Sequence, residues 1–276
     1  MISSTANSKV KRLAALVQKA KMRREEQLFV VEGVRMFREA PVPWIREVYV
    51  SEAFLRKLEG EAGDQKARDI RERLKKCRCE VLADVVFQKV SDTQTPQGVL
   101  CVLAMPHYEL AEYVDRWMTD SQKAPLLVLL EDLQDPGNLG TILRGGEGGG
   151  VDGVIMTRQT VDIFNPKVIR ATMGSIYRVP FFVTENMGDT IDFLKKSGVT
   201  VYAAHLEGSV DYDQPDYALP TAFLIGNEGG GLRRETAARA GQYIKIPMLG
   251  QVESLNAAAA ATILMYEAAR QRRRKV

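Results

Sequence analysis

The chain has 276 residues, of which 45% are hydrophobic and 26% are charged. This length accommodates one large domain or two smaller ones, and the composition is ordinary for a soluble globular protein. No apolar run approaches the roughly 20 residues that span a bilayer, so no membrane partner is expected. Three cysteines without a CxxC or CxxH pairing and two histidines favour neither a disulfide framework nor a metal site. We therefore expect reduced thiols, no metal and a cytoplasmic location.

The net charge of +3 is unevenly distributed along the chain. Residues 1–105 carry 20 Lys and Arg against 14 Asp and Glu, whereas the remainder carries 18 against 21. Such an excess in one half is typical of contact with a polyanion. The first 24 residues contain no acid, which is also typical of a transit peptide. However, Val10, Leu13 and Val17 follow helical spacing, which favours a folded N-terminal helix.

The first half alternates between strand and helix at lengths typical of a compact α/β layer domain. The pattern predicts strands at Leu28–Val31, Glu47–Val50, Cys79–Leu82 and Gln97–Ala104, and helices at Gly33–Ala40, 52–76 and Asp84–Lys89. The stretch Met105–Ala124, bounded by Pro106 and Pro125, is predicted to connect two domains and to hold a helical piece at Leu110–Trp117. The predicted organisation is a domain over residues 1–105, a linker over 106–124 and a second domain over 125–276.

The second half also alternates, and its first predicted strand is fully apolar. The predicted strands are Leu126–Leu130, Gly153–Met156, Phe181–Val183, Val199–Ala203, Ala222–Ile225 and Tyr243–Ile246. Continuous apolar runs are typical of buried parallel strands, and ligands of such sheets bind beyond the carboxyl ends of the strands. Near the C-terminus, Ser254 and Asn256 precede five alanines, Ala257–Ala261. This pattern predicts a capped helix with a surface that another backbone or a ligand can approach closely.

Three loops that follow strands are rich in Gly, Asn, Glu, Ser or Arg: residues 131–150, 225–232 and 247–256. Within these bounds, neither Gly-rich loop contains GxGxxG or GxxxxGK[ST], which disfavours a nucleotide-dependent α/β enzyme, the first alternative function. Taken singly, Asn138 is explained as a helix cap, Glu228 as a charge near a helix N-terminus and Arg144 as a surface arginine. Their occurrence together and in order indicates a functional site.

The motifs N-x-G-x-x-x-R (Asn138 to Arg144), G-N-E-G-x-G-L (Gly226 to Leu232) and I-P-M-x-G-x-x-x-S-L-N (Ile246 to Asn256) resemble those of the SpoU, or TrmH-type, RNA ribose 2′-O-methyltransferases of the SPOUT superfamily. The N-terminal segment, with NSKVKRLAAL and FVVEGVRMFREA, is similar to the smaller substrate-binding domain of that family, which resembles ribosomal protein L30e. This second similarity also favours a folded N-terminal helix over a targeting segment.

The resemblance implies an α/β fold, with an N-terminal L30e-like domain and a C-terminal SPOUT-type parallel sheet that contains a trefoil knot. Two copies are expected to form a homodimer, and S-adenosylmethionine is the expected methyl donor. Residues expected to bind the donor, largely through backbone groups, are Gly226, Ile246, Met248 and Leu255. Residues expected to be catalytic or to position the reacting groups are Arg144, Asn138, Glu228, Ser254 and Asn256.

One departure from the family pattern follows Arg144, where Gly145, Gly146, Gly148 and Gly149 replace small, Ala and aromatic residues. Each Gly in a helix costs about 1 kcal/mol relative to Ala, so a weak helix is expected there unless packing holds it.

The implied reaction is methyl transfer to a ribose 2′-hydroxyl of RNA, with no DNA partner, because that hydroxyl distinguishes RNA from DNA. Two domains favour 23S-type ribosomal RNA as the target, and transfer RNA is the alternative. A non-catalytic RNA-binding assembly factor of the same fold is a further alternative, supported by the glycine change. Family proposals make Arg144 the base, but the high pKa of arginine favours a phosphate clamp that polarises the hydroxyl.

Overall fold

The computed structural model describes residues 1–61, 63–120, 124–207 and 210–274. The chain divides into two compact units, one formed by Met1–His107 with Asp162–Tyr177 and the other by Tyr108–Val161 with Arg178–Val276. Residues 121–123 of the predicted linker and 275–276 of the predicted second domain lie outside the described residues. The domain boundaries predicted after residues 105 and 124 stay a prediction. The prediction does not include the assignment of Asp162–Tyr177 to the first unit.

In the part of the chain that the structure describes, the first unit is built on a four-stranded sheet in the order β1-β4-β2-β3. Its strands are β1 (Leu28–Glu32), β2 (Ile45–Ser51), β3 (Cys79–Leu82) and β4 (Val99–Ala104). Strand β4 is antiparallel to β1 and β2, and β2 is parallel to β3. The helices are α1 (Ser8–Gln18), α2 (Ala20–Glu26), α3 (Val34–Glu39), α4 (Glu52–Gly60), α5 (Gln65–Lys75), α6 (Asp84–Val90) and α9 (Pro166–Thr172), with short 3-10 turns η1 (Val42–Trp44) and η2 (Ser175–Tyr177). The mixed α/β character of this half is therefore confirmed.

The first unit contains the predicted N-terminal helix and the helical stretch predicted over 52–76. The predicted N-terminal helix is α1, whose first turn is capped by Asn7 through a hydrogen bond from Lys9 N to Oδ1. The helical stretch predicted over 52–76 contains two helices, because Asp64 caps a new helix, α5, after α4 has ended at Gly60.

The segment that contains α9 belongs to the first unit through both apolar and polar contacts. The rings of Phe29 and Phe164 pack with centroids 4.6 Å apart. Arg23, only 3% exposed, pairs with Asp162 at 2.5 Å and donates to the carbonyl of Leu16. A buried guanidinium requires such partners, so these bonds fix the entry of α9.

The second unit is built, within the described residues, on a seven-stranded sheet in the order β7-β6-β5-β10-β8-β11-β9. Its strands are β5 (Leu126–Leu130), β6 (Gly153–Thr157), β7 (Phe181–Thr184), β8 (Thr200–Ala204), β9 (Val210–Asp211), β10 (Thr221–Ile225) and β11 (Gln242–Lys245). Every registered pair in this sheet is parallel. All residues of β5, β6 and β10 are buried, as expected for strands covered on both faces. The predicted parallel sheet is confirmed.

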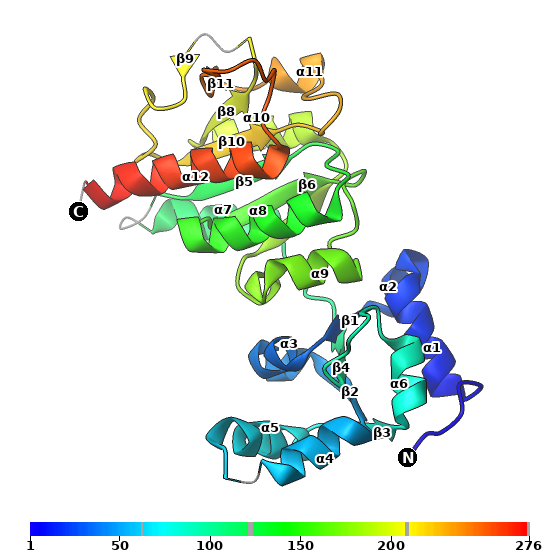
Figure 1. The fold of residues 1–276 in the computed structure, drawn as a ribbon. Helices are drawn as coiled ribbons and strands as arrows, with labels where there is room; N and C mark the ends of the chain where they lie inside the picture. The colour runs from blue at the N-terminus through cyan, green and yellow to red at the C-terminus, as the bar shows by residue number, and fades with distance from the viewer. Residues whose placement is uncertain (62, 121–123, 208–209, 275–276) are drawn as a thin grey trace. The chain divides into compact units, whose positions relative to one another are not determined.

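Helices cover both faces of this sheet. On one face, α8 (Pro136–Gly149) and α12 (Ala257–Arg274) lie side by side, and α12 contacts β5 and β10 (Figure 1). Helices α7 (Leu110–Thr119) and α10 (Met187–Lys196) pack in one core with Leu127, Leu129 and Leu224. Because side chains at alternate positions of a strand share one face, Leu127 and Leu129 of β5 point to the same side of the sheet. The short α11 (Arg234–Ala237) lies next to α10. The trefoil knot stays a prediction.

Helices α8 and α12 approach each other closely at the glycines of α8. A Cβ atom added to Gly145 would lie 3.3 Å from Oγ1 of Thr262, and one added to Gly148 would lie 2.7 Å from the hydroxyl oxygen of Tyr266. The α12 side chains that meet these glycines are Thr262, Met265 and Tyr266, so the absence of Cβ atoms on α8 leaves room for larger side chains of α12. The glycine run therefore has a packing explanation, and this contact holds a helix that intrinsic propensity disfavours.

Among the described residues, the helices are too short or too polar to cross a membrane.

Candidate functional site

The three predicted loops begin at neighbouring points on the C-terminal edge of the sheet. Strands β5 and β10 are adjacent, with Leu130 opposite Ile225, so the loops that follow them start side by side. The third loop follows β11, which pairs with β8, the neighbour of β10 on its other side. Parallel topology thus places these loops at the edge where such sheets bind ligands.

Glu228 joins the second loop to the start of α8. Its Oε1 atom accepts hydrogen bonds from Asp135 N at 2.9 Å and from Asn138 Nδ2 at 2.9 Å, and its Oε2 atom accepts one from Gln134 N at 3.0 Å. Burial raises the pKa of Glu228, but the hydrogen bonds from Asn138, Gln134 and Asp135 outweigh it and hold the pKa below its ordinary value. Glu228 is therefore an ionised acceptor whose oxygens are already engaged.

Asn138 also forms a hydrogen bond with the third loop. Its Oδ1 atom accepts a hydrogen bond from Nδ2 of Asn256 at 2.9 Å. Asn256 in turn caps α12, because its own Oδ1 atom accepts from Ala258 N at 2.9 Å and from Ala259 N at 3.2 Å. The chain Glu228–Asn138–Asn256 thus links all three motif loops by side-chain hydrogen bonds.

Gly226 lies where the second loop turns back on itself. A Cβ atom at this position would lie 2.2 Å from the carbonyl carbon of Gly231 and 2.4 Å from Leu232 N. Asn227 and Gly231 exchange two backbone hydrogen bonds of 3.0 Å, and Gly231 has φ of +64°. Any side chain at position 226 would displace backbone atoms, so the fold of this loop requires glycine.

The third loop presents free backbone groups beside apolar side chains. Within the described part of the chain, the backbone from Ile246 to Leu255 makes no hydrogen bond. Ile246, Met248 and Leu255 are half-buried, whereas Leu249 is fully exposed at 101%. Open N–H and C=O groups next to apolar side chains suit a planar heterocycle, whose edge requires hydrogen bonds and whose face requires apolar contact.

Arg144 and Ser254 stand apart from these hydrogen bonds. Arg144 is exposed on α8, and its side chain forms no ion pair or hydrogen bond with any described residue. It lies six residues after Asn138, about 240° around the helix. Ser254 is exposed, and no hydrogen bond joins it to the described residues. The structure therefore brings together Asn138, Glu228 and Asn256, and the predicted roles of Arg144 and Ser254 stay predictions.

Sequence reasoning missed a second set of polar residues at the same edge, among them Glu131, Asp132 and Arg233. Glu131 and Asp132 follow β5 directly, and Arg233 follows the second loop. Two acids at the carboxyl end of a fully apolar strand are a detectable signal. Their partners lie about 100 residues away in sequence and are not detectable in this way.

Comparison with known proteins gives matches over both halves of the chain. Residues 125–266 match the SpoU rRNA Methylase family, and residues 7–101 match the MRM3-like substrate binding domain. A 23S rRNA (guanosine(2553)-2′-O)-methyltransferase, RlmP, from Bacillus subtilis is 33% identical over 267 residues, which cover 96% of this chain and 97% of that protein.

Two solved structures are similar over nearly the whole chain. An AdoMet-bound rRNA methyltransferase from Sinorhizobium meliloti has a TM-score of 0.79 and 32% identity, covering 98% of this chain and 97% of that one. The SpoU methyltransferase AviRb from Streptomyces viridochromogenes, in complex with AdoMet, has a TM-score of 0.82 and 28% identity, covering 97% and 100%.

Proposed function

This chain belongs to the SpoU rRNA methylase family, and from that premise we propose that it methylates a ribose 2′-hydroxyl in 23S-type ribosomal RNA. The class of activity is S-adenosylmethionine-dependent RNA 2′-O-methylation. The target within RNA and the roles of the individual residues are our proposal. The relative from Bacillus subtilis, which is similar over nearly its full length, acts on 23S rRNA and supports this target.

The observation that carries the proposal is the hydrogen-bonded chain from Glu228 through Asn138 to Asn256. It fixes the start of α8 and the start of α12 next to the open third loop. Asn256 and Asn138 are then positioning residues, because they set the geometry of the loops that surround the reacting groups.

The residues of the site fit S-adenosylmethionine. The free backbone groups between Ile246 and Leu255 suit the adenine edge, and the half-buried Met248 and Leu255 suit its face. Gly226 allows close backbone approach at the turn of the second loop. When bound, this donor supplies a methyl group on a sulfonium, which is already a good leaving group. The protein must therefore chiefly align the 2′-hydroxyl and assist loss of its proton.

Arg144 and Glu228 take different parts in that task. Glu228 is a poor proton acceptor at neutral pH, because its pKa lies below the ordinary value and its oxygens already accept three hydrogen bonds. Arg144 is exposed and unpaired within the described residues, so its guanidinium is available to bind an RNA phosphate and to polarise the hydroxyl. We assign it the role of a clamp.

The first unit is proposed to supply much of the RNA affinity, because the excess of positive charge lies in residues 1–105. We further propose that the chain acts as a homodimer in the cytoplasm. RNA is its partner, as for other members of the family.

Methyl transfer from labelled S-adenosylmethionine to total RNA tests the function. RNA from cells that lack the gene should accept label at one ribose of 23S-type RNA, and RNA from cells that carry the gene should accept little, because that site is already methylated. If the label appears in transfer RNA instead, the target is transfer RNA and the proposed ribosomal target is wrong. Donor binding without transfer to any RNA would favour the assembly factor.

A further inference from the structure

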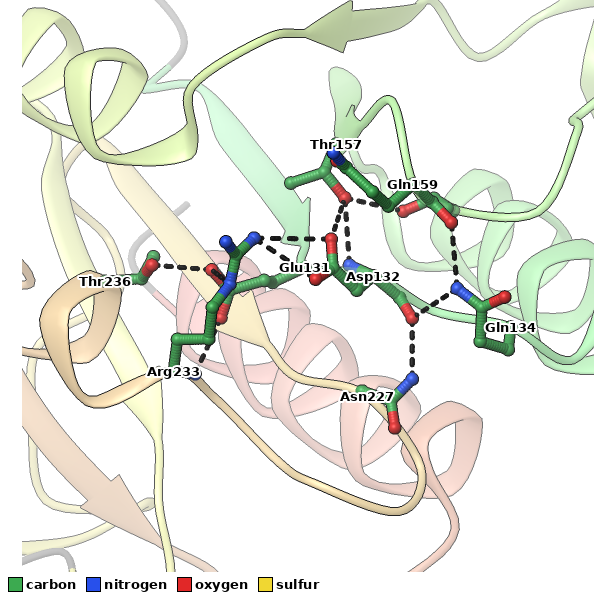
Figure 2. Close-up of polar contacts among 9 residues, drawn as sticks. Glu131, Asp132, Gln134, Thr157, Gln159, Asn227, Arg233 and Thr236 are labelled. Carbon is green, nitrogen blue, oxygen red and sulfur yellow. Dashed lines mark hydrogen bonds and ion pairs between the residues drawn. The ribbon is translucent and has the colours of Figure 1, made fainter.

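Glu131 is a buried carboxylate that the proposed reaction does not use. It is 1% exposed and follows β5 directly, and its backbone N donates to the carbonyl of Ile225 at 2.9 Å. Its Oε2 atom accepts from Arg233 N at 2.8 Å, and its Oε1 atom accepts from Oγ1 of Thr236 at 2.5 Å (Figure 2). The Arg233 side chain lies 3.1 Å from Oε1 through Nε. Burial of a charge is costly unless such partners compensate it, so Glu131 holds Arg233 and Thr236 in place.

Asp132 performs the matching task at the other end of the second loop. Its φ of +54° lies in the left-handed region, which non-glycine residues rarely adopt. In this conformation its carbonyl accepts from Nδ2 of Asn227 at 2.7 Å, and its carboxylate pairs with Arg233 at 3.1 Å (Figure 2). Thr157 stabilises the conformation, because its Oγ1 atom accepts from Asp132 N at 2.9 Å and donates to Oδ1 at 2.7 Å.

Both ends of the loop Gly226–Leu232 are therefore tied to the two acids after β5. Asn227, near its start, bonds to Asp132, and Arg233, directly after its end, bonds to Glu131 and Asp132. Between these ties lies the turn that packs against Gly226. The hydrogen bonds of Glu228 belong to the same loop but reach α8 instead.

We propose that Glu131 and Asp132 are positioning residues that hold the loop Gly226–Leu232 in its donor-binding shape before S-adenosylmethionine arrives. This inference rests on the proposed function, in which Gly226 binds the donor. A loop held in advance loses less conformational entropy on binding, so the two acids contribute to donor affinity without touching the donor. Neither acid is required to contact RNA.

Glu131→Gln tests the inference, because it keeps the shape of the side chain but removes its charge and replaces one of the two accepting oxygens by an NH2 group, which cannot accept. We expect the Kd for S-adenosylmethionine, measured by calorimetry, to rise about tenfold. The Kd for RNA and the turnover at saturating donor should stay within about threefold of the wild type. Without any ligand, the backbone amide of Arg233 should exchange hydrogen faster than in the wild type.

Glu267→Gln is the matched control, because Glu267 on α12 is 9% exposed and pairs with Arg270 at 2.6 Å. It removes a comparable carboxylate away from the loop and should leave the donor Kd unchanged, even if the Tm falls. Arg233→Lys keeps the backbone N–H that Glu131 accepts from and should affect the donor Kd less than Glu131→Gln. Should Glu131→Gln not fold, Thr236→Val removes one bond to the same carboxylate and should raise the donor Kd about threefold.

A donor Kd within twofold of the wild type in both Glu131→Gln and Thr236→Val would overturn the inference. An equal rise of Kd in Glu267→Gln would also overturn it, because the effect would then reflect general destabilisation. If the wild-type protein binds S-adenosylmethionine and methylates RNA, and the variants bind the donor equally well, only the positioning role is refuted. A wild-type protein that does neither refutes the proposed function itself.

Discussion

The side-chain amide of Asn256 donates a 2.9 Å hydrogen bond to Oδ1 of Asn138, across 118 residues of sequence. The Oδ1 atom of Asn256 caps α12 by accepting a hydrogen bond from Ala258 N, and the Nδ2 atom of Asn138 donates to Oε1 of Glu228. Each asparagine thus uses its donor and its acceptor in different directions, which neither aspartate nor alanine can reproduce.

Asn256→Asp should separate the cap from the link to Asn138. An aspartate still accepts from Ala258 N and Ala259 N, so the cap survives, whereas an ionised carboxylate cannot donate to Asn138. We expect turnover to fall about tenfold or more, with less loss of stability than in Asn256→Ala, which removes a cap contribution of about 1 kcal/mol. Single-turnover methyl transfer and thermal unfolding of both variants measure the difference. Equal turnover in Asn256→Asp and the wild type would contradict the role of the link.

The lowered pKa of Glu228 predicts a specific pH dependence of stability. The unfolded carboxyl titrates near the ordinary value of 4.5, and the folded one below it. The contribution of Glu228 is therefore fully present above about pH 4.5 and is lost as the pH falls through the folded pKa. Glu228→Gln should lower stability at pH 7 and reduce the loss of stability between pH 5 and 3. Denaturant titrations of both proteins between pH 7 and 3 measure the free energy of unfolding. If Glu228→Gln loses as much stability between pH 5 and 3 as the wild type, another carboxylate is responsible for the loss.

Convergence of the three motif loops was predictable from the sequence because it depends on topology. Apolar runs indicate parallel strands, and parallel strands bring their carboxyl ends to one edge, where Asn138, Glu228 and Asn256 now meet. The glycines after Arg144 are visible in the sequence, but the reason for them depends on the position of α12.

Other features could not be predicted because their partners are distant in sequence. The apolar residues Phe164 and Ile169 fit many helices equally well, and only the structure pairs their segment with β1. Burial of Glu131 likewise depends on Arg233 and Thr236, about 100 residues later. Local patterns give the elements and their faces, whereas the choice of partner is a property of the whole fold.

Two adjacent glycines at the end of α8 should respond in opposite ways to alanine. A Cβ atom on Gly149 meets the Cβ of Met265 at 3.5 Å, an ordinary contact, so Gly149→Ala should raise the free energy of unfolding by up to about 1 kcal/mol. Gly150 has φ of +76°, so Gly150→Ala should lower it by about 1–2 kcal/mol although space is available. Urea unfolding of both variants measures the sign. A lower free energy of unfolding in Gly149→Ala than in the wild type would show that the contact with α12 is tighter than the distances indicate.

A fragment of residues 108–276 should bind S-adenosylmethionine as well as the full chain, because the bonds among Asn138, Glu228 and Asn256 lie within it. RNA affinity should fall strongly, since the positive excess of residues 1–105 is absent. The fragment should also aggregate, because Phe164 loses its contact with Phe29. Calorimetry, RNA binding at two salt concentrations and light scattering measure these effects, and Phe164→Ser in the fragment should reduce the aggregation alone. Donor binding that needs residues 1–105 would refute this division of tasks.

Arg144 is the residue on which the proposed mechanism depends, and its guanidinium, exposed and without a partner among the described residues, makes a sharp test possible. Arg144→Lys keeps the charge but loses the planar fork that binds two oxygens at once. If Arg144 only attracts RNA, lysine should preserve most of the activity. If it clamps a phosphate and orients the 2′-hydroxyl, turnover should fall, because a charge-assisted bidentate contact contributes roughly 2–4 kcal/mol, or about 30- to 1000-fold in rate.

Single-turnover methyl transfer on saturating RNA, with donor affinity measured separately, distinguishes these cases. The donor Kd should stay unchanged in Arg144→Lys, because Arg144 makes no hydrogen bond or ion pair with the described residues of the donor loops. Arg158→Lys is the matched control: Arg158 is also an exposed arginine, and its ion pair is with Glu185. It should keep wild-type turnover. Near-normal turnover in Arg144→Lys would move the catalytic role elsewhere, and the exposed hydroxyl of Ser254 would be the next group to test.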